Sequence, residues 1–211
     1  MRDTCRDLAT STAVAEQADQ RARLLAAAAS VLSDGGYAGM TIARVCDRAG
    51  MSNTTFYEEF EDREACFLAL FERTVAQATS AAVEACDGAQ AWRNQVRSGL
   101  ASLLGFLDAE PQLASIAVVD ALGTGPRVLA RRAQVLDLLA TVVADGRLEA
   151  TVGNEPPALT ADVAVGGAFS VIHTRLLDGD SGPLLALLDP LMSTIVAPYL
   201  GPEAAAQELD R

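Results

Sequence analysis

The 211-residue sequence contains no lysine, so its sixteen basic residues are all arginines, and His173 is its only histidine. Its four cysteines, Cys5, Cys46, Cys66 and Cys86, form no Cys-x-x-Cys pair and lie far from that histidine along the chain. This scarcity argues against a zinc site and against a disulfide framework. We therefore expect no metal and no cofactor, and we expect Cys46 and Cys66 to pack as small hydrophobic side chains.

The sequence motifs of the common enzyme classes are also missing. There is no Gly-x-Ser-x-Gly, no Gly-x-Gly-x-x-Gly and no phosphate-binding loop. His173 has no nucleophile motif to pair with, so an all-α enzyme that uses Cys5 or His173 is kept only as an alternative. We expect a protein that is not an enzyme and has no catalytic residues.

Long hydrophobic runs are absent too. Half of the residues are hydrophobic, yet no unbroken run reaches the roughly 18 apolar residues of a membrane span. Residues 1–7 mix both charges and no apolar stretch follows them, which does not fit a secretory signal peptide. The sequence predicts a soluble cytoplasmic protein with no membrane partner.

The net charge of −12 is unevenly distributed. Residues 20–57 carry four arginines against two aspartates, a balance of +2, whereas residues 65–211 carry nine arginines and seventeen carboxylates, a balance of −8. This asymmetry indicates a small, mildly basic N-terminal module joined to a larger acidic body.

Apolar residues recur at helical spacing throughout, and no competing strand pattern is present, so we predict an all-α protein. After a loose arm over residues 1–15, the first helix covers 16–34 and ends at Gly35-Gly36. Its apolar stripe comprises Leu24, Leu25, Ala28, Val31 and Leu32. Beyond residue 62 we expect helices over 63–86, 89–107, 111–122, 126–145, 160–178 and 181–199.

Three further features are predicted in the C-terminal half. Residues 147–159 form the longest irregular connection. Pro190 either kinks the last helix or restarts it behind Asp189 as a cap. Gly201-Pro202 ends the ordered fold.

Two short helices lie between these regions. Thr41 caps one that ends at Ala49-Gly50, and Ser52 caps the next, which turns Phe56 and Phe60 inward. Two short helices around an Ala-Gly turn form a helix-turn-helix. Asp62 is the predicted N-cap of the helix that follows.

This segment resembles the DNA-binding region of TetR-family transcriptional regulators. The resemblance is carried by residues 41–60 (TIARVCDRAGMSNTTFYEEF), with Gly36-Tyr37 before them and Asp62-Arg63-Glu64 after them. More loosely, the C-terminal body resembles some family members over residues 120–126, 166–167 and 197–201. The resemblance implies a helix-turn-helix domain over 16–61 and a ligand-binding and dimerisation domain over 62–211.

The resemblance further implies a homodimer whose two recognition helices enter successive major grooves of a palindromic DNA operator. The chemistry of the exposed helix end makes Asn53 and Thr55 candidates for base reading, beside Ser52 and Thr54. By family position, Thr41, Tyr57 and Arg63 are expected to contact phosphates. Arg44 could reach either the DNA backbone or a base.

Two acidic residues depart from the family pattern. Glu58 and Glu59 place carboxylates at the end of the recognition helix, where they would oppose phosphate. We expect Glu59 to point away from DNA and Glu58 to form a local pair.

The larger domain supplies the remaining candidates. Those for ligand binding are Trp92, Phe106, Phe169 and His173, with a plain core role as the alternative for each. The final helices contain more leucine than one face must bury, which fits a four-helix dimer interface; intramolecular core is the competing explanation. The interface candidates are Val171, Leu176, Leu177, Leu184, Leu188, Leu191 and Ile195.

The leading hypothesis is a ligand-responsive DNA-binding regulator, a repressor released from its operator by an unknown small molecule. The alternative is a small-molecule binding module that retains the helix-turn-helix only as a fold element. The net charge of −12 and the Glu58-Glu59 pair favour that alternative.

Overall fold

A computed structural model describes residues 2–86, 91–150, 156–179 and 182–211. Every regular element in these ranges is helical, which confirms the all-α prediction. The α-helices are α1 (Arg2–Gly39), α2 (Ile42–Ala49), α3 (Asn53–Glu59), α4 (Arg63–Cys86), α5 (Trp92–Ala109), α6 (Pro111–Ala114), α7 (Pro126–Ala144), α8 (Thr160–Asp178) and α9 (Leu188–Leu209). Four short segments of other helix types are η1 (Ser115–Val119), η2 (Asp120–Gly123), η3 (Asp145–Leu148) and η4 (Leu184–Leu187).

The chain forms two compact units, Met1–Glu72 and Arg73–Arg211. The division falls inside α4, about ten residues beyond the boundary we expected between residues 61 and 62. The start of α4 belongs to the first unit because Phe67 is buried there, with its ring 5.2 Å from that of Tyr37 in an edge-on contact.

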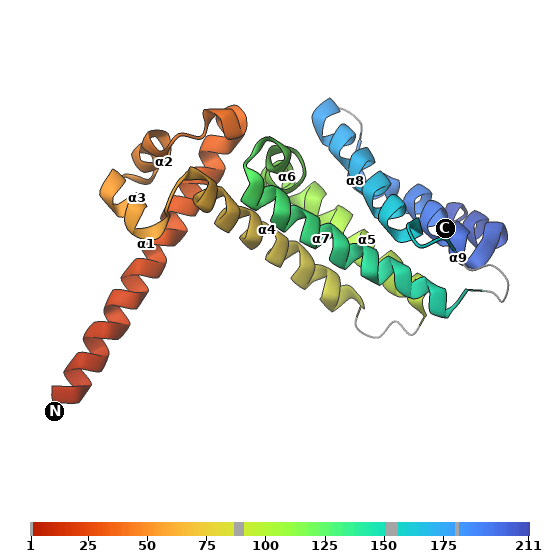
Figure 1. Ribbon diagram of the computed structural model, residues 1–211, viewed down its shortest axis with the longest axis horizontal. Coiled ribbons are helices and arrows are strands. Elements are labelled where there is room, and N and C mark those ends of the chain that lie inside the picture. Colours follow the sequence, from red (N-terminus) through yellow and green to blue (C-terminus); the bar gives the residue numbers. More distant parts are fainter. Residues whose placement is uncertain (1, 87–90, 151–155, 180–181) are drawn as a thin grey trace. The chain divides into compact units, whose positions relative to one another are not determined.

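In the first unit, α2 packs against α1, and α3 packs against α2 (Figure 1). All five predicted stripe residues of α1 are buried. The helix breaks where predicted, since Gly35 and Gly36 have non-helical backbone angles. The predicted loose arm is wrong for the backbone, because α1 already begins at Arg2. No glycine or proline precedes Gly35, so nothing in the sequence interrupts the helix.

The helix-turn-helix forms as the sequence predicts. Gly50 adopts φ 65° and ψ 39°, a left-handed conformation that side-chain-bearing residues rarely take, so the chain can turn sharply after α2. Phe56 and Phe60 are buried, with ring centroids 5.5 Å apart. The predicted cap of α4 is confirmed as well, since Asp62 Oδ1 accepts a hydrogen bond of 2.7 Å from the backbone N–H of Ala65.

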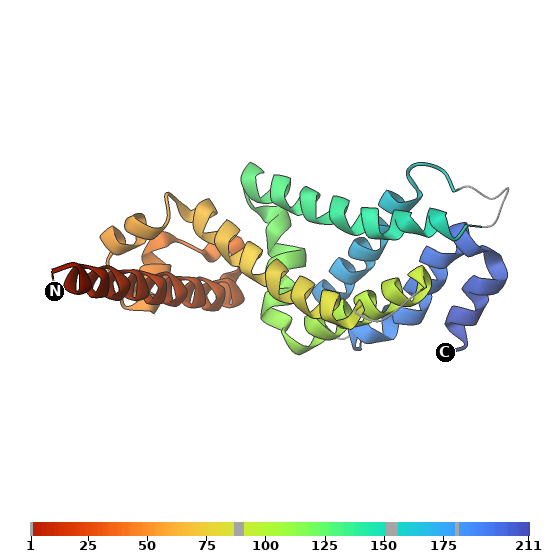
Figure 2. The ribbon, with the colours of Figure 1, turned by 90° about the horizontal axis from the view of Figure 1, so that it is seen from below.

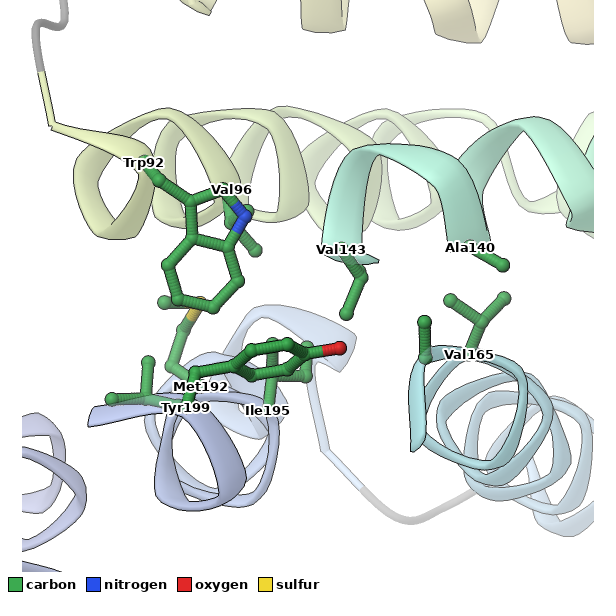
Figure 3. Packing of buried hydrophobic residues seen from close by; sticks show 10 residues of the cluster. Trp92, Val96, Ala140, Val143, Val165, Met192, Ile195 and Tyr199 are labelled. Carbon is green, nitrogen blue, oxygen red and sulfur yellow. The ribbon is translucent and has the colours of Figure 1, made fainter. Parts of the chain in front are cut away.

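The second unit packs α5, α7, α8 and α9 against one another, as the two ribbon views show (Figures 1 and 2). One of its cores is centred on Trp92 and Tyr199, whose ring centroids are 5.1 Å apart (Figure 3). The Trp92 indole N–H donates to the carbonyl of Val142 at 2.9 Å. Gly146 lies so close to the indole that a Cβ there would meet it at 2.6 Å.

A second core lies at the other end of this unit and contains Leu104, Val118, Ile172 and Leu184. The chain axis turns by 110° between α5 and the segment that starts at Pro111. We expected one helix over 111–122, but the structure has a short α-helix, then a π-helical turn and then a 3-10 turn. The changes of helix type let both Ile116 and Val118 reach buried positions.

The C-terminal segment corrects another expectation. Gly201-Pro202 does not end the fold, because α9 continues to Leu209 beyond a break at Gly201, where φ is 84°. Proline suits the first turn of a helix, so Pro202 restarts the helix after the turn. Pro190 lies in the first turn of α9, close to the predicted restart. The residues after the break are anchored by Glu208, which is fully buried and paired with Arg93 and Arg97.

The segment Leu184–Leu209 has a mean hydropathy of 1.5 in its most apolar 18-residue window, which meets the length and composition test for a membrane span. Part of this segment packs inside the second unit. Met192, Val196 and Tyr199 are fully buried, and Arg97 pairs with Asp189 at its start. Of the window as a whole, 39% is buried, whereas Leu185 and Leu209 are exposed.

The other predicted helices agree with the structure to within a few residues. Residues 89 and 90, at the expected start of α5, lie outside the described ranges, as do 151–155 of the predicted connection and 180–181 near the expected start of the last helix. Helix α8 covers the predicted range and ends at Gly179.

Candidate nucleic-acid interface

The N-terminal end of α3 presents polar side chains to solvent. Asn53 and Thr54 are exposed, while the apolar side of the same helix is fixed by Phe56. Ser52 is the N-cap, because its Oγ accepts a hydrogen bond of 3.1 Å from the backbone N–H of Thr55. The amide of Asn53 and the hydroxyl of Thr54 are therefore available to an external partner.

Thr55 lies differently from its neighbours. Its side chain is half-buried, and its Oγ1 is 3.0 Å from Oγ of Ser52, a hydrogen bond in which either hydroxyl can donate. The pair stabilises the start of α3. Ser52, Asn53 and Thr54 are the exposed residues of the predicted reading set, and Thr55 is half-buried.

Thr41 and Arg44 lie at the start of α2. Thr41 Oγ1 accepts from the backbone N–H of Arg44 at 3.3 Å and so caps the helix, as predicted. Arg44 is exposed but folds back, since its guanidinium donates to the carbonyl of Gly39 at 2.8 Å. The remaining N–H groups of Arg44 are free to meet a phosphate or a base.

Tyr57 and Arg63 complete the predicted set. The Tyr57 ring is 59% exposed and packs edge-on against Phe56 at 5.7 Å, which fixes its direction. Arg63 is half-buried, with its guanidinium carbon 4.3 Å from the ring centroid of Tyr37 and one N–H donated to the carbonyl of Met40 at 3.4 Å. Tyr57 is thus presented outward, whereas Arg63 is held against the first unit.

Arginines in this unit share a structural task that the sequence did not reveal. Each donates to a backbone carbonyl at or beside the end of a helix: Arg44 at α1, Arg23 to Ala49 of α2 at 3.0 Å, and Arg21 to Glu59 of α3 at 3.0 Å. A cation at a helix C-terminus satisfies an orphan carbonyl and interacts favourably with the helix dipole. The sequence shows that arginines are present on neighbouring helices. Only the tertiary structure identifies the carbonyl to which each arginine donates.

The two acidic residues of α3, Glu58 and Glu59, differ in exposure and in pairing. The Glu59 side chain is only 4% exposed and its carboxylate is 3.6 Å from the guanidinium of Arg21, so it turns inward as expected. Glu58 is exposed, and no ion pair to it is found within the described ranges, which corrects the expected local pair. The solvent-facing side of α3 consequently combines neutral polar groups with one carboxylate.

The predicted ligand residues lie in the second unit. Trp92 is buried in the core described above, and Phe106 and Phe169 are partly buried against the second core. His173 is half-buried. The structure does not bring all four into one cavity among the described residues, so their role in ligand binding stays a prediction.

The predicted interface residues fall into three groups. Leu184, Leu191 and Ile195 are buried within a single chain, in agreement with the competing core explanation. Leu176 and Leu188 are partly buried against the cores, whereas Val171 and Leu177 are exposed.

An apolar groove of about 590 Å³ lies between α8 and α9. Its walls come from one face of each helix. Val171 of α8 and parts of Leu191 and Ile195 of α9 therefore line the same groove. The lining residues are Pro157, Leu159, Thr160, Val163, Ala164, Gly167, Ala168, Val171, Leu191, Thr194, Ile195 and Pro198. Leu159 and Val163 are 68% and 71% exposed, unusually high values for large apolar side chains.

The cysteine thiols near the helix-turn-helix are buried, as predicted for Cys46 and Cys66. Burial raises the pKa of the Cys66 thiol to about 12. It also raises the pKa of Cys46, whose Sγ lies 3.6 Å from the carbonyl of Ser52. Both thiols are therefore protonated at neutral pH and poor nucleophiles.

Comparison with known protein families agrees with this architecture. Residues 24–70 match the family model described as bacterial regulatory proteins, tetR family. The chain is also 26% identical over 113 residues to the HTH-type transcriptional activator FasR of Mycolicibacterium smegmatis. That match covers 54% of this chain and 52% of FasR, so the chain spans about half of the length of FasR.

Solved structures with the same fold include a transcriptional regulator and a fatty acid degradation regulator, both named FadR. FadR of Bacillus subtilis, solved in complex with stearoyl-CoA, has a TM-score of 0.69 at 16% identity, over 84% of this chain and 98% of that one. FadR of Bacillus halodurans has a TM-score of 0.72 at 17% identity, over 84% and 94% of the two chains. This likeness establishes the fold: an N-terminal helix-turn-helix domain and a larger helical domain.

Proposed function

We propose that this chain, a member of the TetR family, is a ligand-responsive, DNA-binding transcriptional regulator. The observation that carries the proposal is the exposed polar end of α3. Asn53, Thr54 and Tyr57 face solvent on a helix whose direction is fixed by buried Phe56. Amide, hydroxyl and phenol groups can read base edges and hold phosphates in a major groove.

A homodimer is the second part of the proposal. The groove between α8 and α9 is lined almost entirely by apolar residues, and Val163 and Val171 are exposed on it. A second copy of the chain would cover this face with the same face of its own, as two-fold symmetry requires. Two helices per chain would then form a four-helix interface.

The dimer can be tested by sedimentation of matched variants. Val163→Arg places a charge on the groove, whereas Leu138→Arg places the same charge at a similarly exposed position, 64%, on α7. We expect the wild type and Leu138→Arg to sediment as dimers and Val163→Arg to dissociate. A monomeric wild type, or equal behaviour of the two variants, contradicts the proposed interface.

A small molecule would control DNA binding from the second unit. Helix α4 contains residues of both units, so a ligand that prefers one arrangement of the second unit can bias the position of α4. Long-chain acyl-CoA is the first ligand to test, because FadR of B. subtilis was crystallised with stearoyl-CoA. We propose that the ligand releases the protein from a palindromic operator and that the protein is a repressor.

DNA binding is tested by fluorescence anisotropy at low salt, with a duplex from the region upstream of the protein's own gene. We expect binding by the wild type and by Asn94→Ala, which changes an exposed residue of α5. Tyr57→Ala should weaken binding about tenfold through loss of a phosphate contact. Addition of stearoyl-CoA should lower the affinity of the wild type if the protein is a repressor that this ligand releases.

One observation favours a second candidate, a ligand-binding module without DNA binding. The arginines near α3 already donate to Gly39, Ala49 and Glu59, and the net charge is −12. Few cations would then remain to displace counterions from DNA. Ligand binding by a wild type that shows no DNA affinity at low salt would favour this candidate.

A further inference from the structure

Glu58 lies on the solvent-facing side of α3, beside the exposed residues of the predicted reading set. Residues four apart on a helix share a face, so Glu58 lies one turn beyond Thr54 on the same side. Asn53 and Tyr57 form the adjacent row. All four side chains are exposed, whereas Phe56 of the same helix is fully buried. A partner that meets the amide of Asn53 and the hydroxyl of Thr54 is therefore within reach of the Glu58 carboxylate.

The charge of Glu58 has no internal role among the residues that the structure describes. Its side chain makes no ion pair and no hydrogen bond with them. The neighbouring Glu59, by contrast, is only 4% exposed and faces Arg21 at 3.6 Å. A carboxylate near the C-terminal end of a helix also interacts unfavourably with the helix dipole, and α3 ends at Glu59. A charge that lowers stability without a compensating contact points to a functional role.

The chemistry of the major groove restricts what such a carboxylate can bind. An ionised carboxylate accepts hydrogen bonds and donates none, and DNA phosphates repel it. The base groups that donate in the major groove are the amino groups of cytosine and adenine. Adenine carries the acceptor N7 beside its amino group, guanine presents N7 and O6, and thymine presents O4, and all of these oppose a carboxylate. Cytosine is therefore the base that Glu58 favours most.

We propose that Glu58 is a specificity-determining residue that accepts a hydrogen bond from the amino group of a cytosine in the major groove of the operator. The same carboxylate disfavours guanine and thymine at that position, because two acceptors would face each other. A duplex with another base there meets only the repulsion between the carboxylate and the phosphates, so discrimination comes from repulsion as well as from attraction. The inference rests on the proposed function and assigns the base chemistry of one position in each half-site.

The test is selection of bound sequences from a random duplex pool at low salt, with the wild type, Glu58→Gln and Glu58→Ala. We expect the wild type to enrich cytosine at one position of each half-site. Glu58→Gln should enrich adenine at that position instead, because the glutamine amide both donates and accepts and can form two hydrogen bonds with adenine. Glu58→Ala should leave the position without preference. The rest of the motif should stay as in the wild type.

Fluorescence anisotropy on two duplexes measures the size of the effect. One duplex is the enriched palindrome, and the other carries guanine in place of the selected cytosine in each half-site. We expect the wild type to prefer the first duplex at least about tenfold and Glu58→Ala to bind both alike. The control is Asp47→Asn, which removes one negative charge from an exposed residue of α2 and should keep the wild-type preference.

Loss of the fold is excluded as a cause by the melting temperatures of the two Glu58 variants. They should equal or exceed that of the wild type, because Glu58 is exposed and its charge opposes the helix dipole.

Two results would overturn the inference alone. One is a wild-type palindrome that both Glu58 variants leave unchanged. The other is tighter binding of both duplexes by Glu58→Ala to the same extent, which would mean that Glu58 only repels phosphates. A wild type that enriches no sequence would overturn the proposed function together with this inference.

Discussion

Arg21 of α1 holds the end of α3 through two groups of Glu59: it donates to the carbonyl oxygen at 3.0 Å and faces the carboxylate at 3.6 Å. Its guanidinium carbon also lies 4.5 Å from the ring centroid of Phe60. One arginine thereby caps the helix, neutralises a nearly buried carboxylate and covers an aromatic ring. The direction of α3, and with it of Asn53 and Tyr57, depends on this contact.

Loss of Arg21 should destabilise the first unit. Arg21→Ala removes a charge-assisted hydrogen bond and leaves the Glu59 carboxylate without a cation, at a cost of about 1–3 kcal/mol. Urea unfolding followed by circular dichroism measures the change. The control is Arg48→Ala, which breaks an exposed pair with Asp34 at 2.7 Å and should cost less than about 1 kcal/mol. Equal losses in the two variants would contradict the role of Arg21.

Gly146 should tolerate no side chain. A Cβ would lie 2.6 Å from the Trp92 indole, which is fixed by its hydrogen bond to Val142. We expect Gly146→Ala to destabilise the protein by about 1–3 kcal/mol, as overpacking of a core does.

Gly166 provides the matched control for that substitution. It lies inside α8, and a Cβ there would meet no atom within 4 Å. Gly166→Ala should stabilise the protein by about 0.5–1 kcal/mol, because alanine loses less backbone entropy in a helix. Thermal unfolding of both variants checks the pair, and destabilisation by both would show that crowding at Trp92 is not the cause.

Alkaline pH should weaken the fold through Cys66. Its pKa is about 12 in the folded protein against an ordinary 9.0, so the unfolded chain loses the proton first. The stabilisation is complete below pH 9 and is lost as the pH rises toward 12. Cys66→Ala should therefore show a shallower fall in the free energy of unfolding between about pH 9 and 11. An unchanged slope would mean that the thiol titrates alike in both states.

Local chemistry made much of the first unit predictable. Thr41, Ser52 and Asp62 all act as caps, and Gly50 takes the left-handed turn, because each feature depends on only a few neighbouring residues. The partners of Arg21 could not be predicted in this way. They depend on which helices meet in three dimensions, and sequence spacing does not encode that directly.

The second unit shows the same limit. Leucine content did not separate buried Leu184 and Leu191 from exposed Leu177, since all three lie in apolar segments. Gly201-Pro202 has the composition of a chain end, yet it joins two helical stretches because Glu208 finds arginine partners beyond it. Pairing between distant residues decided the outcome in both cases.

The central claim is that the exposed end of α3 reads DNA. Selection of bound sequences from a random duplex pool at low salt tests it most directly, with the wild type, Asn53→Ala and the control Asn94→Ala. We predict that the wild type and Asn94→Ala enrich the same palindrome, and that Asn53→Ala loses preference at one position of each half-site, worth about 1–3 kcal/mol. No enrichment by the wild type, or an unchanged motif with Asn53→Ala, would contradict the account.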